Sequence, residues 1–209
     1  MTTIKELKHF NIGESYGGNQ DWFRSYMMRL GGCGAETACD LSIYLKKHKG
    51  IEKACELFID NITRQDYVDF AHEMKKYLWP RLTGIDKASI WIEGYANYLE
   101  NKGVNFIKMR EFSGEEAYKD ASHVLKNQID RGFPIPNLTL RHRDKEFDDY
   151  NWHWFLINGY KIEDDKNGNE KIFVKAVTYS EYEWLDFEKL WNTGNEKRGG
   201  LVLVDIRET

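Results

Sequence analysis

The sequence predicts an α+β fold in a single domain of residues 1–209, with a helical half over about residues 1–131 and a β half over about residues 132–209. The first observation is a change of periodicity. Apolar residues recur at helical spacing in the first half, whereas short β-rich runs fill the second. The second observation is that no linker, repeat or low-complexity tract divides the chain. Helices followed by strands are typical of an α+β domain whose two halves pack face to face.

The first half contains four predicted helices. The central one covers residues 35–48, which are apolar on most sides and small in the first turns, as in a helix buried in the middle of a domain. Three further helices are predicted over residues 51–62, 63–79 and 86–101. Thr63 is the expected N-cap of the helix over 63–79, and Pro80 ends that helix.

The second half is predicted to be mainly strands. A short strand over 104–109 and an amphipathic helix over 114–131, closed by Gly132, lead into it. Pro134 and Pro136 impose extended backbone on residues 137–140. The remaining expected elements are strands over 152–160 and 171–178 with a hairpin turn at 164–169, a short helix over 186–191 and a strand over 201–206.

Composition excludes several classes of protein. The 209 residues are 41% hydrophobic and 31% charged, with a formal net charge of −4 and no basic stripe of the kind that binds nucleic acid. No apolar run approaches the length of a membrane span, and residues 1–8 lack the apolar core of a signal peptide. We therefore expect a cytoplasmic protein that binds neither nucleic acid nor a membrane. The oligomeric state stays open.

A candidate nucleophile lies at the start of the central helix. Cys33 stands in the run Gly31-Gly32-Cys33-Gly34-Ala35, directly before that helix. A thiol at a helix N-terminus faces unpaired N–H groups and the positive end of the dipole, which favour the thiolate. The neighbouring glycines allow a tight turn and leave the sulfur uncrowded. Such a nucleophile needs a base, and His153, at the head of an apolar strand, can supply one.

The strand that carries His153 is predicted to be covered on both sides. Because side chains alternate along a strand, one face holds His153, Phe155 and Ile157, and the other holds Trp152, Trp154 and Leu156. Both faces are apolar, which is typical of a buried strand. Taken alone, His153 also fits a core histidine that is hydrogen-bonded to the backbone.

The remaining cysteines and histidines predict no metal site. The spacing of Cys33, Cys39 and Cys55 matches no zinc pattern, and Cys39 and Cys55 are interpreted as small core residues. The other histidines have no metal-binding spacing, and all but His123 fall in polar or charged stretches. They are His9, His48, His72, His123 and His142. His123, in the amphipathic helix, and His72, in a charged helical segment, are interpreted as surface or rim residues. We expect no metal and no cofactor.

Two passages resemble papain-like cysteine peptidases, and most closely their bacteriocin-leader-peptidase branch. The first is Gly32-Cys33-Gly34-Ala35. The second runs from a helix ending Ile129-Asp130-Arg131-Gly132, through Pro134-Ile135 and a strand, to His153-Trp154-Phe155-Leu156-Ile157-Asn158-Gly159-Tyr160. The resemblance covers roughly residues 20–206. It implies a papain-like fold, with the nucleophile on a central helix packed against an antiparallel sheet.

The resemblance also implies two further site residues. Papain-like enzymes use a glutamine upstream of the cysteine in the oxyanion hole, and the upstream glutamine here is Gln20, thirteen positions before Cys33. Either a longer loop through residues 22–30 bulges out and returns, or Asn19 or the backbone takes that role. The family orients its histidine with Asn or Asp, for which this chain offers Thr178, or as second choice Ser180.

These observations predict a papain-like thiol hydrolase that cleaves a peptide or a related amide or thioester bond in a peptide or protein substrate. In this interpretation Cys33 attacks as a thiolate, His153 carries the proton, and Gln20 with the Cys33 amide stabilises the oxyanion. Two alternatives stay open. One is acyl transfer on the same scaffold. The other is an inactive binding module, indicated by the missing Asn or Asp and by the seven tryptophans.

Overall fold

An antiparallel sheet forms the middle of the molecule in the computed structural model, which describes residues 2–81, 84–164 and 170–207. Its strand order is β4-β9-β5-β6-β7-β8, and β1 pairs with β6 beside this path. The strands are β1 (Thr3–Glu6), β4 (Ile107–Ser113), β5 (Ile135–Thr139), β6 (His153–Asp164), β7 (Glu170–Thr178), β8 (Glu181–Asp186) and β9 (Gly199–Ile206). A separate small hairpin joins β2 (Asn11–Ile12) to β3 (Ser15–Tyr16). Helices and antiparallel strands together make the fold α+β.

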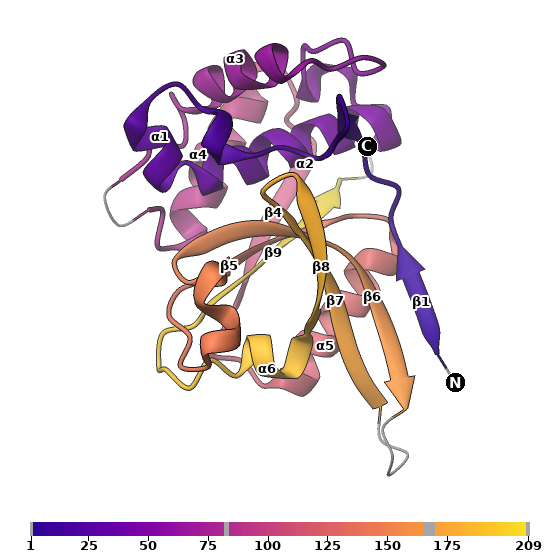
Figure 1. The fold of residues 1–209 in the computed structure, drawn as a ribbon. Coiled ribbons are helices and arrows are strands. Elements are labelled where there is room, and N and C mark those ends of the chain that lie inside the picture. The colour runs from indigo at the N-terminus through magenta and orange to yellow at the C-terminus, as the bar shows by residue number, and fades with distance from the viewer. Residues whose placement is uncertain (1, 82–83, 165–169, 208–209) are drawn as a thin grey trace.

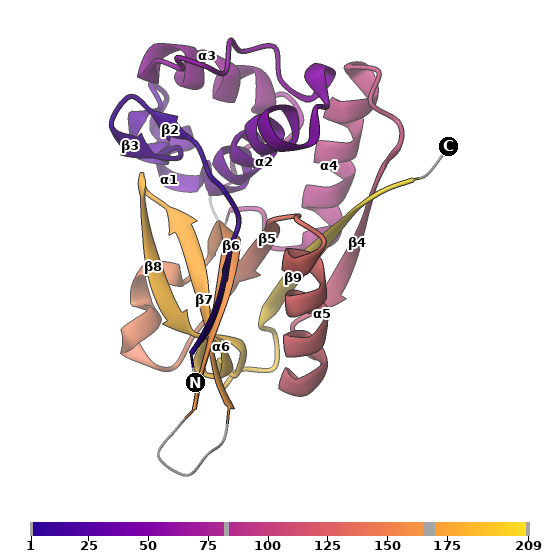
Figure 2. The ribbon, with the colours of Figure 1, turned by 90° about the vertical axis from the view of Figure 1, so that its right-hand side faces the viewer.

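Helices cover both faces of the sheet (Figures 1 and 2). The helices are α1 (Tyr26–Gly31), α2 (Cys33–Lys49), α3 (Arg64–Met74), α4 (Ala88–Asn101), α5 (Tyr118–Asp130) and α6 (Phe187–Trp191), with short 3-10 turns η1 (Gln20–Trp22), η2 (Glu52–Ala54) and η3 (Lys145–Tyr150). One core cluster joins α2, α3 and α4 to one sheet face, and a second joins α5 and α6 to the other. None of the helices within the described ranges is long and apolar enough to cross a membrane.

Strand β6 has the two-sided burial predicted from its sequence, except that Trp152, which was expected on one of the buried faces, lies before the strand and is 41% exposed. Trp154 and Leu156 belong to the cluster that contains α2, whereas Phe155 and Ile157 belong to the cluster that contains α5. Helix α2 crosses this strand and is itself buried from Cys33 to Leu45. The central helix and the His153 strand are therefore packed against each other, which brings the two candidate catalytic residues into one region.

Most of the predicted helices are confirmed, with one exception. Helices over 35–48, 86–101 and 114–131 correspond to α2, α4 and α5, and Thr63 caps α3 in a reciprocal capping box with Asp66. α3 stops at Met74, before the expected end. The helix predicted over 51–62 is wrong, because only the η2 turn forms there. Instead of joining a helical ladder, the carbonyls of Cys55 and Leu57 accept hydrogen bonds from the Lys46 ammonium group.

The predicted strands are present, but the sheet also recruits segments that the sequence did not indicate. Strands β5, β6, β7 and β9 and the short helix α6 match their expected positions, and β4 begins at Ile107. Of the expected turn at 164–169, residues 165–169 lie outside the described residues. Strands β1 and β8 were not predicted. Because β1 and β4 come from the first half of the chain and α5 packs beneath the sheet, the sheet does not follow the expected division at residue 131.

Gly159 permits the pairing between β1 and β6. A Cβ atom at this position would lie 2.8 Å from the carbonyl oxygen of Lys5 and 3.2 Å from the Cα of Glu6. The β6–β7 register also shifts between Ile157 and Tyr160, so Gly159 stands in a bulge. A side chain here would push β1 off the sheet, which explains the glycine in physical terms.

Candidate active site

The Cys33 thiol lies at the junction of helix α2 and strand β6. Cys33 is the first residue of α2, and the residue is 3% exposed. The sulfur faces the backbone N–H groups of Trp154, Gly34 and Cys33 itself. The predicted position at the head of a central helix is therefore confirmed, and the thiol also contacts the strand that begins with His153.

Two tryptophans hold this junction together. The Trp91 indole N–H donates to the carbonyl of Gly34 at 2.8 Å, and the Trp154 indole N–H donates to the carbonyl of Ile85 at 2.7 Å. Their rings stack with centroids 5.3 Å apart. A Cβ at Gly34 would lie 3.2 Å from Ile85 and 3.3 Å from Trp91, so a side chain at this position would crowd the Ile85 side chain and the Trp91 indole. The first turn of α2 is thereby fixed against α4 and β6.

The His153 imidazole is held by Thr178, the last residue of β7, and by Tyr179 in the turn that follows. Its Nε2 lies 2.8 Å from the Thr178 hydroxyl, and the Tyr179 ring stacks on it in parallel. Thr178, the first choice from sequence, is therefore the residue that contacts the ring. The hydroxyl of Ser180 is instead buried with no hydrogen-bond partner among the described residues. No hydrogen bond in the described part of the chain engages Nδ1 of His153, so this nitrogen is the one left for proton exchange.

Cys33 and His153 line one cavity of about 380 Å³. The full set of residues that line it is Gln20, Leu30, Gly31, Cys33, Gly84, Arg141, Asn151, Trp152, His153 and Tyr179. The expected thiol–imidazole hydrogen bond is not among those formed by the described residues. Catalytic hydrogen bonds often tighten only when substrate binds. The cavity therefore brings nucleophile and base together without joining them directly.

Gln20 also lines this cavity, although the chain passes through two short helical segments on its way from Gln20 to Cys33. Gln20 begins η1, and the chain then passes through α1 before it reaches Cys33, thirteen positions after Gln20. The Gln20 side-chain N–H₂ donates to the carbonyl of Arg29 at 3.0 Å. The segment through residues 22–30 thus bulges out and returns, which is one of the alternatives left open by the sequence. Asn19 instead caps η1 through Asp21 and does not line the cavity. One N–H of Gln20 stays free for a ligand, and its Oε1 is buried with no hydrogen-bond partner in the described ranges.

Burial favours the neutral forms of both candidate catalytic groups. Removal from water raises the pKa of the Cys33 thiol to about 11, although the N–H groups around the sulfur oppose this rise. Burial also lowers the pKa of His153 to about 4. The expectation of a thiolate at rest is therefore wrong for this structure, because the desolvation penalty exceeds the effect of the helix N-terminus. The resting pair is a thiol and a neutral imidazole.

Two buried acids behind Cys33 were missed from the sequence. The Glu36 carboxyl accepts a hydrogen bond from the Gln20 backbone N–H at 3.1 Å, and the N–H of Tyr179 also faces it. Asp40 accepts from the Tyr67 hydroxyl at 2.7 Å and from the Gly18 N–H. Burial raises the pKa of Glu36 well above its usual range, and that of Asp40 to about 7. The sequence did contain a signal for this network: Glu36 and Asp40 are four residues apart, and so share one face of a helix that was predicted to be buried.

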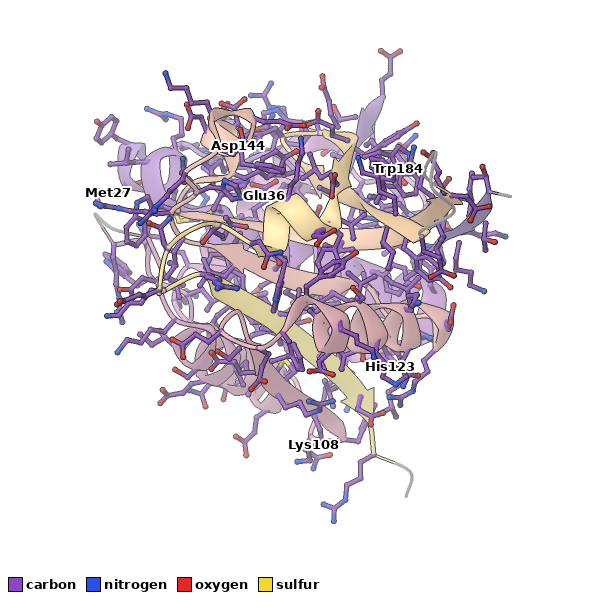
Figure 3. All side chains as sticks on the ribbon, turned by 90° about the horizontal axis from the view of Figure 1, so that it is seen from below. Met27, Glu36, Lys108, His123, Asp144 and Trp184 are labelled. Atoms are coloured by element: carbon purple, nitrogen blue, oxygen red, sulfur yellow. The ribbon has the colours of Figure 1, made fainter. Side chains whose placement is uncertain are left out.

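The other cysteines and histidines stay outside the cavity. Cys39 and Cys55 are buried free thiols in the core, as predicted. His123 is exposed on α5, as predicted, and is labelled at the lower right of Figure 3, on the opposite side of the picture from Met27 of α1. His9 differs from its polar sequence context, since its side chain is buried and its ring stacks on those of Phe10 and Tyr16. The described residues hold no group of three or more His, Cys, Asp or Glu side chains suited to a metal ion.

Comparisons with known proteins give little further information. No family model matches the chain, and no curated protein matches it. Among solved structures, the SERA5 proenzyme from Plasmodium falciparum is similar with a TM-score of 0.32 and 10% sequence identity, over 97% of this chain and 71% of that chain. A TM-score this low carries no inference about fold or activity, so the site is interpreted from its own geometry.

Proposed function

We propose that this protein is a papain-like thiol hydrolase that cleaves a peptide or a related amide or thioester bond. The observation that carries the proposal is the convergence of Cys33, His153 and Gln20, from three separate segments, on one cavity. A nucleophile, a base and an amide donor are the parts that acyl transfer through a thioester requires. The three free cysteines also fit the reducing cytoplasm.

Acylation begins with the neutral pair. The Cys33 sulfur attacks the substrate carbonyl carbon while its proton passes to Nδ1 of His153, since Nε2 is engaged by Thr178. The tetrahedral intermediate then collapses as the carbon–nitrogen bond breaks and His153 gives the proton to the leaving amine. The acyl group stays on Cys33 as a thioester. Proton transfer during attack replaces the preformed thiolate, because burial disfavours either charge at rest.

Hydrolysis of the thioester reverses these roles. His153 takes a proton from water, the hydroxide oxygen forms a bond to the acyl carbon, and the Cys33 thiol is released with the proton returned to sulfur. In both steps the negative oxygen faces the free N–H of the Gln20 side chain and the Cys33 amide, which as the first amide of α2 has no partner within the helix.

A second candidate is a peptide-binding module without catalysis. The burial of Cys33 and the missing thiol–imidazole hydrogen bond favour it. Acyl transfer to an acceptor other than water is a variant of the main proposal, because the steps up to the thioester are identical.

Cleavage of a peptide library, together with trapping of Cys33 by a thioester-forming probe, tests the proposal. Wild type and the control Cys39→Ala, which removes a buried thiol of the same helix outside the cavity, should both cleave and form the adduct. Cys33→Ala should do neither. Peptide binding without cleavage or an adduct in folded wild type would identify the binding module. An adduct resolved only by an added amine or thiol would identify the transferase.

A further inference from the structure

Arg141 places a positive charge in the cavity of the candidate active site, because a guanidinium group stays protonated at all physiological pH values. Among the residues that line the Cys33 cavity in the described ranges, it is the only lysine, arginine, aspartate or glutamate. The ion pairs of the described residues do not include it. His153 is neutral there, since burial lowers its pKa to about 4. The cavity therefore presents one unpaired cation beside the candidate nucleophile.

The Arg141 guanidinium is positioned by Trp152. It lies over the indole ring, 5.5 Å from the centroid, and the indole is 41% exposed. Stacking restrains the flat guanidinium group yet leaves its N–H groups free to donate at the edges. Trp152 has a φ of 54°, which is uncommon outside glycine, and its N–H donates to the carbonyl of Leu140 at 2.6 Å. The backbone thus holds a large exposed ring directly before His153.

Arg141 and Trp152 also line a second, larger cavity of about 730 Å³. They are the two residues that both lining sets share. Leu138 and Leu140 contribute apolar surface to this second cavity. A chain that extends from the candidate nucleophile into the larger cavity must therefore pass the stacked pair.

We propose that Arg141, stacked on Trp152, binds a carboxylate of the substrate close to the scissile bond. This inference rests on the proposed hydrolase function and adds a substrate class to it. A guanidinium binds a carboxylate through two parallel N–H···O bonds, which fixes both position and orientation. The carboxylate comes either from an aspartate or glutamate side chain or from a free C-terminus.

Selective alkylation of Cys33 tests the charge without requiring turnover. The folded protein is treated with iodoacetate, which is anionic, or with iodoacetamide, which is neutral. For each reagent the alkylation rate of Cys33 is divided by the rate of glutathione with the same reagent, which corrects for the intrinsic reactivity of the two reagents. Wild type should favour iodoacetate, and Arg141→Gln should lower the iodoacetate-to-iodoacetamide ratio by about 3- to 10-fold. Arg141→Lys should retain much of the preference. Added salt should weaken it, because the site is open to solvent.

Arg143→Gln is the matched control, since Arg143 lines the larger cavity without reaching the Cys33 cavity. It should leave the ratio unchanged. A ratio that Arg141→Gln does not alter, with Cys33 still reactive, would overturn the role of Arg141 and leave the hydrolase proposal intact. A Cys33 that reacts with neither reagent while the protein is folded would overturn both.

Matched peptides then distinguish the two sources of carboxylate. One pair carries Glu or Gln next to the scissile bond, and the other ends in a free acid or an amide at that distance. A preference for Glu in kcat/KM that Arg141→Gln removes assigns a side-chain carboxylate, and the same result for the free acid assigns a C-terminus. Equal cleavage within both pairs by wild type would overturn the proposal.

Discussion

The rings of His153 and Tyr179 lie parallel, with centroids 4.9 Å apart and an angle of 3° between their planes. The stack covers one face of the imidazole, while the Thr178 hydroxyl contacts its edge at 2.8 Å. Tyr179 and Ser180 both have positive φ, and the Ser180 N–H donates to the carbonyl of Gly18 at 2.7 Å. The turn after β7 is thus fastened to the segment that leads into Gln20, and it orients the candidate base.

Replacement of the Tyr179 ring should loosen His153. We expect Tyr179→Leu to lower kcat by about 2- to 13-fold, the equivalent of an aromatic pair worth about 0.5–1.5 kcal/mol. Tyr179→Phe preserves the stack and should stay close to wild type. Steady-state cleavage of one peptide by the three proteins measures this. Equal losses in the Phe and Leu variants would assign the effect to the phenol hydroxyl instead.

The Thr178 hydroxyl should contribute modestly to turnover. A neutral hydrogen bond is worth about 0.5–1.5 kcal/mol, so Thr178→Ala should reduce turnover by about 2- to 13-fold. Ser180→Ala is the control, because the Ser180 hydroxyl has no hydrogen-bond partner among the described residues. Cleavage rates at saturating peptide give the comparison. A loss of several hundredfold in Thr178→Ala would mean that this residue does more than orient the ring.

The buried thiol should react with a pH dependence that reflects its raised pKa. Only the thiolate alkylates readily, and Cys33 ionises near pH 11, so its rate with iodoacetamide should rise about tenfold per pH unit from about pH 6 to 10. Peptide mapping should still find Cys33 labelled first, since Cys39 and Cys55 are buried outside the cavity. A plateau that begins near pH 5 and disappears in His153→Ala would instead reveal a preformed ion pair.

Glu36 should act as a neutral acceptor that positions Gln20. Its pKa is raised by burial, so the folded state binds a proton that the unfolded state releases, and stability should fall as pH rises above about 4.3. Glu36→Gln keeps an oxygen for the Gln20 N–H and should weaken that pH dependence, of which the part due to the raised pKa of Asp40 remains. Glu36→Ala leaves the N–H unpaired and should cost about 1–3 kcal/mol.

Urea unfolding at several pH values measures both effects of the Glu36 variants. If Glu36→Gln is as unstable as Glu36→Ala at neutral pH, the carboxyl is ionised in the folded protein and the assignment of a neutral group is wrong.

Local patterns explain what the sequence predicted correctly. The small residues after Cys33, the alternation after His153 and the capping signal at Thr63 each act within a few residues, and each is present in the structure. The contact between Thr178 and His153 was predicted from the resemblance, which implies an orienting residue on the strand after His153, and the structure brings the two side chains together because β7 pairs with β6.

Features set by distant parts of the chain were not predictable in this way. In the 51–62 segment, which forms no α-helix, the carbonyls of Cys55 and Leu57 accept hydrogen bonds from Lys46 of α2. The edge strand β8 carries exposed charges and has no continuous apolar face. The thiol pKa follows burial by the assembled core, whereas the sequence showed only the helix N-terminus. The positive φ of Trp152 and the contact of its ring with Arg141 were not indicated by any local residue pattern.

The pairing of β1 with β6 has a consequence for the order of folding. The hydrogen bond from the Asn158 side chain to the carbonyl of Leu7 spans 151 positions, so this contact closes one of the longest loops in the chain. Local helices form early, whereas contacts of such separation wait until the intervening chain is ordered. During synthesis the β1 segment emerges long before its partner. The strand that begins with His153 is therefore completed by a segment that is synthesised about 150 positions earlier, since Leu7 and Asn158 are 151 positions apart.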